Sequence, residues 1–192
     1  MTPALKLQPT SVDEYLAGEF VSNVKHEYIA GNVYAMAGGR NSHNLIASNC
    51  QGELYGRLSG QPCRTYNSDT KIRIRLQTQT RFYYPDASVI CDPNSPDDTF
   101  QDCPVLIAEV LSDATRRIDE GEKKDAYLTI PTLSVYMLIE QDFPAVVVFR
   151  RSDNGFEREL YTELDAVIPL DEIQIELPLS EIYDGVEFEE HE

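Results

Sequence analysis

Two acidic residues interrupt apolar segments of this chain of 192 residues. Asp86 stands directly before the run Ala-Ser-Val-Ile, and Glu109 lies inside the apolar run from Val105 to Leu111. An acid in a core strand is unfavourable unless it is paired or binds a cation. Carboxylate oxygens suit magnesium or manganese, which can lower the pKa of bound water and polarise a phosphoryl oxygen. The two acids therefore predict a divalent-metal site for hydrolysis of a phosphodiester bond.

A lysine that could complete this site lies on a predicted helix. Lys123 comes one turn after Asp119, so the two side chains share a helix face. A lysine there would orient the attacking water and offset negative charge at the phosphorus. Lys124 is the second choice, because it would lie about 100° round the helix. Two ordinary explanations stay open: a buried ion pair of Glu109 with a lysine, and a surface pair of Asp119 with Lys123.

The elements that must position these residues alternate between helices and strands. From capping signals, breakers and periodicity we expect helices at about 11–17, 41–58, 116–128 and 179–183. We expect strands at about 26–29, 33–36, 63–66, 71–76, 81–91, 105–111, 134–139 and 145–149. This order fits one α/β domain over residues 1–192, with a mixed β-sheet flanked by α-helices.

Strand periodicity sets the direction of the key side chains. Residues two apart share a face of a strand, so Glu109 points the same way as Ile107 and Leu111. If the strand of Asp86 lies beside that of Glu109, both carboxylates converge on one point. Between residues 71 and 76, strict alternation directs the apolar residues inward and the three basic residues outward.

The net charge of −17 is unusual for a protein that binds nucleic acid, since polyanions are usually met by basic surfaces. Residues 157–192 carry 13 acids and one base, so most of the excess charge is C-terminal. From about residue 184 we expect an acidic tail that is solvated or partly disordered. The charge weakens the case for a nuclease without excluding it.

Cysteine spacing and the lack of long apolar runs limit the class of protein further. Cys50, Cys63, Cys91 and Cys103 form no CxxC pair, so we expect reduced thiols and no zinc ribbon. No apolar run approaches the roughly 20 residues that span a bilayer, so no membrane partner is expected. The first residues lack the order of a signal peptide, and we expect a cytoplasmic protein.

Short pieces of the chain, taken in order, match one family pattern. They are Glu27-Tyr-Ile-Ala-Gly31, the glycine turn before His43, Asn67-Ser-Asp69, Pro85-Asp86, Glu109-Val-Leu-Ser112, Thr115-Arg-Arg-Ile-Asp119, Gly121-Glu-Lys123, Tyr127 and Ile130-Pro131. On these pieces the chain resembles the Uma-type restriction endonuclease family, a bacterial branch of the PD-(D/E)XK nuclease superfamily. The resemblance runs from Glu27 to Asp142, which is well over half of the chain.

The resemblance implies a restriction-endonuclease-like fold and Mg²⁺-dependent cleavage of DNA, with Mn²⁺ as a substitute. It implies Asp86 and Glu109 as metal ligands, and the main-chain carbonyl of Val110 often completes such a coordination. The lysine that superfamily members usually carry two residues after the Glu is replaced by Leu111. Families of this kind are thought to place it on the following helix, which makes Lys123 the candidate. A homodimer is expected by analogy, because cutting both strands with one site per chain needs two chains.

Other residues are candidates for assisting roles. Glu27 is a catalytic candidate, because superfamily members often bring an N-terminal Glu to the site. The residues that could contact DNA or support the site are His43, Arg73, Arg75, Arg81, Asp119 and Tyr127. The alternatives are ordinary: helix capping for the histidine, packing for the tyrosine, and a solvated sheet face for the arginines.

Together these residues predict a metal-dependent endodeoxyribonuclease. One rival is a catalytically inactive nuclease-fold protein that binds DNA or a protein, which the missing strand lysine and the negative charge favour. The other rival is an interaction protein whose acids form structural ion pairs.

Overall fold

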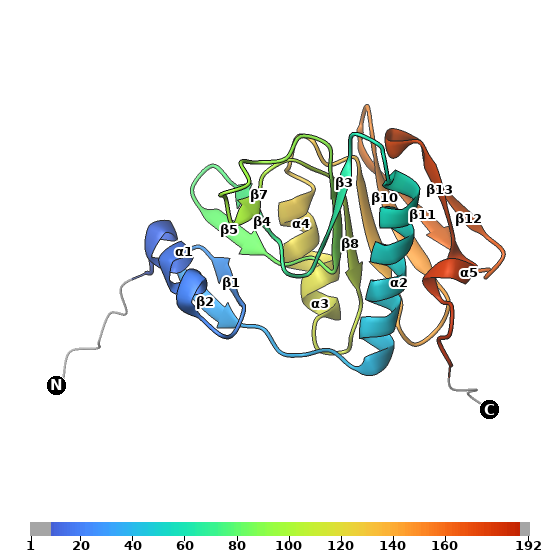
Figure 1. The fold of residues 1–192 in the computed structure, drawn as a ribbon, viewed down its shortest axis with the longest axis horizontal. Coiled ribbons are helices and arrows are strands. Elements are labelled where there is room, and N and C mark those ends of the chain that lie inside the picture. Colours follow the sequence, from blue (N-terminus) through green and yellow to red (C-terminus); the bar gives the residue numbers. More distant parts are fainter. Residues whose placement is uncertain (1–8, 189–192) are drawn as a thin grey trace.

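Two larger β-sheets form the framework of the structure, a computed structural model that describes residues 9–188 (Figure 1). The central sheet has the strand order β11-β10-β9-β8-β6-β3, and the side sheet has the order β2-β1-β5-β4-β7. The central strands are β3 (Arg64–Asn67), β6 (Ala87–Ile90), β8 (Pro104–Val110), β9 (Val135–Ile139), β10 (Val146–Ser152) and β11 (Gly155–Tyr161). The side strands are β1 (His26–Ile29), β2 (Asn32–Ala35), β4 (Lys71–Arg75), β5 (Thr80–Tyr83) and β7 (Phe100–Gln101). A small third sheet pairs β12 (Val167–Leu170) with β13 (Ile175–Pro178).

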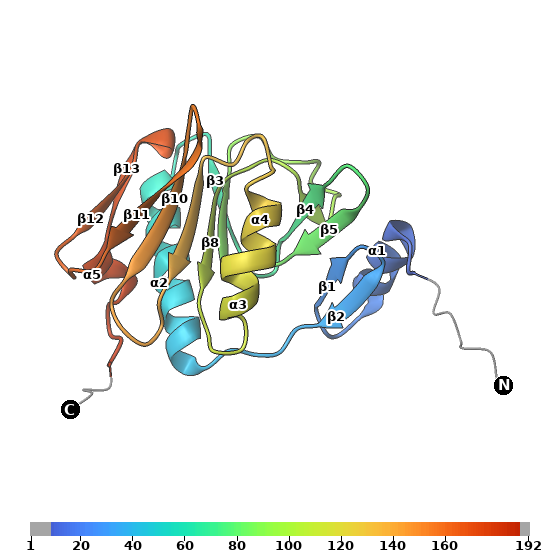
Figure 2. The same cartoon turned by 180° about the vertical axis from the view of Figure 1, so that it is seen from behind.

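Helices cover both faces of the central sheet. They are α1 (Val12–Val21), α2 (Asn41–Leu58), α3 (Arg116–Ile118), α4 (Lys124–Tyr127) and α5 (Leu179–Ile182), with a π-helical turn η1 (Asp119–Lys123) and a 3₁₀ turn η2 (Asp171–Ile173). α2 lies on one face and the run α3-η1-α4 lies on the other, as two opposite views show (Figure 1 and Figure 2). This arrangement confirms the predicted fold class, a single α/β domain with a mixed sheet flanked by helices. Within residues 9–188, no helix is both long and apolar enough to cross a bilayer.

β8 runs through the middle of the central sheet and separates two hydrophobic cores. It pairs antiparallel with β6 and parallel with β9. Leu106, Ala108 and Val110 join the core under α2, whereas Ile107 and Leu111 join the core under α4. Burial on both faces explains why this segment is a continuous apolar run.

α1 covers the outer face of the side sheet through aromatic rings. Tyr15 of α1 packs on Tyr28 and Phe82, with ring centroids 5.0 and 5.2 Å away. Phe100 of β7 completes this cluster. Around β4 and β5 the side sheet is therefore covered on both faces, whereas β2 is exposed throughout.

This cover corrects the predicted outward face of β4. The two isoleucines of β4 are buried as expected, but Lys71 is buried too, with 5% of its surface exposed. Arg73 donates two hydrogen bonds to Asp102, at 2.7 and 2.6 Å, and its guanidinium lies 4.0 Å from the centre of the Phe100 ring. The alternation indicated which residues share a face, but a sequence pattern does not show that α1 and β7 cover that face.

The strand predicted at 81–91 is two strands in two different sheets. β5 ends at Tyr83 and β6 begins at Ala87, so the chain crosses between them from the side sheet to the central sheet. Pro85 explains the break, because proline has no N–H to donate to a strand ladder. Asp86 therefore stands at the junction of the two sheets.

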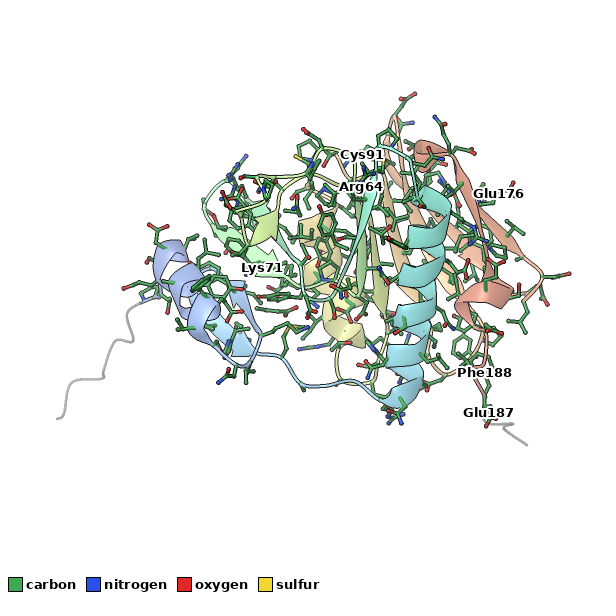
Figure 3. All side chains as sticks on the ribbon, in the orientation of Figure 1. Arg64, Lys71, Cys91, Glu176, Glu187 and Phe188 are labelled. Atoms are coloured by element: carbon green, nitrogen blue, oxygen red, sulfur yellow. A yellow bond between two sulfur atoms is a disulfide. The ribbon has the colours of Figure 1, made fainter. Side chains whose placement is uncertain are left out.

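Two predicted boundaries also move. α1 begins with the predicted capping box of Ser11 and Glu14 but runs to Val21, beyond the expected end near residue 17. A single glycine inside a helix costs only about 1 kcal/mol, so the helix continues past it. In the predicted acidic tail, Asp184, Gly185 and Glu187 are exposed, and Phe188 packs its ring 5.5 Å from that of Tyr183 (Figure 3). Residues 189–192 lie outside the described part of the chain.

Cys63 and Cys91 form a disulfide, which corrects the expectation of four reduced thiols. Pairing of β3 with β6 sets Arg64 opposite Ile90, so the cysteines meet one position further, with Cα atoms 3.9 Å apart. They are separated by 28 residues in the sequence, and only the strand pairing reveals that they meet. Cys50 and Cys103 are free thiols.

We expect Arg73→Met to lower the free energy of unfolding by about 2 kcal/mol, because it removes a bidentate charge-assisted pair from the partly buried Asp102 carboxylate. Chemical denaturation measures this change. Arg75→Met is the matched control: the Arg75 side chain is 65% exposed and 3.8 Å from Asp102, and its loss should change stability by less than about 0.5 kcal/mol.

The Arg73 effect should also depend on pH. Burial alone would raise the pKa of Asp102, but the hydrogen bonds from Arg73 and Asn94 lower it below the ordinary value. The stabilisation is therefore present at neutral pH and is lost as the pH falls through that lowered pKa. Equal destabilisation by both variants, or a difference that persists in strong acid, would contradict this assignment.

We expect thiol titration of the unfolded, unreduced protein to detect two thiols, and four after reduction. In the double variant Cys63→Ser/Cys91→Ser, the free energy of unfolding should fall by about 3 kcal/mol. This is the usual contribution of a disulfide that closes a 28-residue loop. Cys103→Ser serves as the control that removes a free thiol. Four thiols before reduction would show that the bridge does not form.

Candidate active site

Asp86 is held against β8 by a hydrogen bond at the junction of the two sheets. The antiparallel register that pairs Ala87 with Ala108 brings Asp86 level with Glu109. Oδ2 of Asp86 accepts a hydrogen bond of 2.7 Å from the main-chain N–H of Val110. Burial raises the pKa of Asp86, while His43 and the Val110 N–H oppose that rise. The two acids predicted as neighbours are therefore neighbours, with Glu109 on β8 and Asp86 directly before the adjacent strand β6.

Glu109 is a buried carboxylate with two partners on the helical run below the sheet. It lies on the same face as Ile107 and Leu111, as the alternation predicted. Its Oε1 accepts a hydrogen bond of 3.1 Å from the Tyr127 hydroxyl and lies 3.6 Å from Nζ of Lys123. Burial raises the pKa of Glu109 well above its ordinary value, and the Lys123 ammonium only partly offsets that rise.

Lys123 is the cation that these carboxylates share. Its Nζ lies 2.8 Å from Oε1 of Glu27, 3.3 Å from Oδ1 of Asp119 and 3.6 Å from Oε1 of Glu109. Burial by itself would lower the pKa of Lys123, but the three carboxylates outweigh burial and raise it. The lysine is therefore charged at neutral pH. Its ammonium also lies 5.5 Å from the centre of the Tyr83 ring.

A π-helical turn positions Lys123 and Asp119. η1 spans Asp119–Lys123 between the two short α-helical segments, and such turns are frequent at functional sites. The Tyr136 hydroxyl donates a hydrogen bond of 3.0 Å to the carbonyl of Asp119 and so fixes the start of the turn. Arg116 clamps the preceding helix to Glu140 with two hydrogen bonds of 2.7 and 2.5 Å. The predicted helix at 116–128 thus contains an irregular turn where the site lies.

His43 completes the group on the side of α2. Its Nε2 lies 3.5 Å from Oδ2 of Asp86, and the side chain is 16% exposed. Its Nδ1 is buried without a hydrogen-bond partner among the described residues. A Cβ added at Gly39 would stand 3.0 Å from that nitrogen, so the glycine turn leaves room for the imidazole. The ring therefore faces the candidate site.

Several predicted residues are not brought to this place. Arg73 is engaged with Asp102, and Arg75 extends from the same strand. Asp69 lies in the β3–β4 turn, where it pairs with Lys25 and is 76% exposed. Lys124 places its ammonium 5.1 Å from the Phe149 ring centre, away from the acids. Among the predicted arginines, Arg81 lies close by, paired with Glu122 of η1 at 3.0 Å.

Two supporting residues were missed by sequence reasoning. Tyr83 lies under the Lys123 ammonium, and Tyr136 holds the π-helical turn. Tyr83 directly precedes the Tyr-Pro-Asp segment, so its position beside Asp86 was an available signal. Tyr136 has no such signal, because it acts on a segment 17 residues away through a side chain that otherwise looks like core.

The donor set fits a hard divalent cation with an incomplete protein shell. Oδ1 of Asp86 and Oε2 of Glu109 accept no hydrogen bond from residues 9–188. In the same part of the chain, no three His, Cys, Asp or Glu side chains are gathered so as to hold a metal by themselves. Mg²⁺ usually takes only one or two carboxylates, with water and substrate phosphates as the other ligands. Two acids, each with a free oxygen, agree with that coordination preference.

Comparisons with known proteins identify the family. A family model named Uma2 and described as "Putative restriction endonuclease" matches residues 12–180. An uncharacterized protein of Synechocystis sp., slr1290, is 33% identical over 97% of this chain and 98% of its own length. A second, sll1609, is 33% identical over 67% of this chain and 73% of its own length.

A solved structure shares the fold. It is a crystal structure of "a putative nuclease belonging to DUF820" from Anabaena variabilis, with a TM-score of 0.71 and 20% identity. The match covers 91% of this chain and 98% of that one. The chain therefore belongs to the Uma2 family of restriction-endonuclease-like proteins.

Proposed function

We propose that this protein is a metal-dependent endonuclease that hydrolyses phosphodiester bonds of DNA. The observation that carries the proposal is the convergence of Asp86, Glu109 and Lys123 at the junction of the two sheets. These groups come from three separate elements, β8, η1 and the segment before β6. Two carboxylates with free oxygens next to a protonated lysine suit a reaction in which a phosphate gains negative charge.

Asp86 and Glu109 would hold Mg²⁺, with Mn²⁺ as a substitute and the Val110 carbonyl as a further ligand. When bound, the metal lowers the pKa of a water and polarises a phosphoryl oxygen. Asp86 is already fixed by the Val110 N–H, and Glu109 by the Tyr127 hydroxyl. Both carboxylates are thus oriented before a ligand arrives, which reduces the reorganisation needed for reaction.

Lys123 would act as a hydrogen-bond donor rather than as a base. Its pKa is raised by the surrounding carboxylates, so it keeps its proton at neutral pH and cannot take one from water. Its ammonium can instead orient the attacking water and stabilise charge on the phosphoryl oxygens. Glu27, 2.8 Å from the same ammonium, is a positioning residue for it.

The negative charge of the chain is compatible with a DNA substrate because of where the acids lie. The acid-rich segment from residue 157 onward forms β11, β12, β13 and α5, at the opposite side of the molecule from β1 and β5 (Figure 1). The buried acids of the candidate site would be met by the metal. Each chain has one such site, so we propose a homodimer for cutting both strands.

We expect the double variant Asp86→Asn/Glu109→Gln to lose Mg²⁺ and Mn²⁺ binding in calorimetry and to nick supercoiled plasmid at least about 1,000-fold more slowly. A metal supplies several kcal/mol of transition-state stabilisation, and each 1.4 kcal/mol is about tenfold in rate. The variant should fold, because Lys123 keeps Glu27 and Asp119 as partners. Asp153→Asn, in the exposed turn between β10 and β11, is the control and should leave both measurements unchanged.

Equal heats in wild type and double variant, with no nicking by either, would overturn this proposal. The acids would then be structural ion-pair partners.

Lys123→Met should reduce nicking by about 100-fold or more while calorimetry still detects metal binding, since a single charge-stabilising donor is worth that much. Lys124→Met is the matched control one residue away and should cleave like wild type. Lys123→Met also leaves three carboxylates without their cation, so the metal-free variant should be destabilised by about 3 kcal/mol. Thermal melts with and without Mg²⁺ separate this effect from catalysis. Wild-type cleavage by Lys123→Met would exclude the lysine from the reaction.

A further inference from the structure

A cavity of about 820 Å³ lies on the other side of the side sheet from Lys123. Its walls are the chain after α1 (residues 22–25), the β3–β4 turn and the loop that leads into β7. Figure 3 labels Lys71 and Arg64, which both line it. Its volume lies within the range of ordinary small-molecule sites. None of the candidate active-site residues lines this cavity.

Lys71 is a buried ammonium without a full set of partners. Only 5% of the residue is exposed, and Nζ donates one hydrogen bond, of 3.3 Å, to the Tyr84 hydroxyl. Two of its three N–H groups have no acceptor among residues 9–188. Burial lowers the pKa of Lys71, and Glu19 only partly opposes this. A buried lysine ammonium with unfilled donors is stabilised by an anion that accepts its hydrogen bonds.

Neither Glu19 nor Asp69 accepts a hydrogen bond from Lys71, because each has other partners. Glu19 accepts from His26 Nδ1 at 2.7 Å and from the Tyr84 hydroxyl at 2.7 Å. Asp69 pairs with Lys25 at 3.1 Å. The unfilled hydrogen-bonding capacity of Lys71 therefore faces the cavity rather than a protein carboxylate.

The cavity wall combines three basic residues, Lys25, Arg64 and Lys71, with aromatic ones, and it also carries the acids Glu19, Asp69 and Asp98. The ammonium groups of Lys25 and Lys71 lie 5.7 and 5.4 Å from the centre of the Tyr84 ring. Arg64 donates to two main-chain carbonyls and is exposed, so part of its guanidinium is free. Tyr66 also lines the cavity. Cations beside aromatic rings are the usual means of binding a nucleotide without reading its sequence.

We propose that this cavity binds a nucleotide through its phosphate group, with Lys71 as the anchor. The phosphate oxygens accept hydrogen bonds from the two free N–H groups of Lys71. Arg64 and Lys25 add positive potential. The cavity is much larger than a phosphate, which leaves room for a sugar and a base against the tyrosines. The nucleotide is either free or part of a single DNA strand, since both present the same phosphate.

The cavity and the candidate active site share one short segment of chain. Tyr83 faces Lys123, whereas Tyr84, the next residue, makes no such contact and instead accepts a hydrogen bond from Lys71. Asp86 follows two residues later. A nucleotide in the cavity therefore contacts the segment that carries a proposed metal ligand. The binding itself needs no metal, so it stands independently of the nuclease proposal.

The test is binding of thymidine monophosphate to the full chain in the presence of a metal chelator, measured by calorimetry. We expect binding by wild type and about tenfold weaker binding by Lys71→Met, because a charge-assisted hydrogen bond to an anion is lost. Lys71→Arg, which keeps the charge, should retain most of the affinity. Arg158→Gln removes one positive charge from the exposed face of β11 and should bind like wild type. Thymidine without its phosphate should not bind.

A second arm identifies the source of the phosphate. Fluorescence anisotropy with a labelled oligothymidylate compares the same variants. Loss of oligonucleotide affinity in Lys71→Met, with little binding of the mononucleotide, assigns the cavity to a DNA strand, whereas the reverse assigns it to a free nucleotide. Lys71→Met should fold, because Tyr84 keeps Glu19 as its partner, and thermal melts check this. Absence of binding by both probes, or equal binding by wild type, Lys71→Met and Arg158→Gln, would overturn the proposal.

Discussion

The shared ammonium of Lys123 is the interaction on which the rest of the site depends. Glu27 comes from the side sheet, Glu109 from the central sheet and Asp119 from the π-helical turn, and all three lie within 3.6 Å of Nζ. Without that cation, three buried carboxylates would repel one another across the junction of the sheets. With it, three acids still share one ammonium, and Asp86 adds a fourth acid nearby. A site with more acids than cations is suited to take up a further cation.

Three tyrosines make this charged group compatible with the core. The ring of Tyr127 packs 5.5 Å from those of Tyr83 and Tyr136, so the acids lie against a wall of aromatic rings. The hydroxyls of Tyr127 and Tyr136 donate to Glu109 and to the carbonyl of Asp119. Burial raises the pKa of both phenols, which therefore remain donors. Low polarity around the site strengthens every charge interaction inside it.

The parts of the fold that follow from local patterns were predictable, and those that depend on which surfaces meet were not. The apolar run of β8 and its period of two placed Glu109 correctly, and the helical spacing of Asp119 and Lys123 placed both on one turn. Periodicity shows which residues share a face but not what covers that face. For this reason the pairing of Arg73 with Asp102, across 29 residues, and the disulfide of Cys63 with Cys91 were both missed. Each forms only once distant strands have paired.

Pro85 affects both the strand topology and the candidate site. By ending the strand after Tyr83, it divides what the sequence suggests is one strand between two sheets. A continuous strand would have placed Asp86 inside a ladder, with its backbone paired and its side chain directed by simple alternation. At a break, the side chain can instead turn to the N–H of Val110 and stand beside Glu109. The two residues therefore act together. Pro85 ends the strand at the junction of the sheets, and this break leaves the Asp86 side chain free to lie beside Glu109.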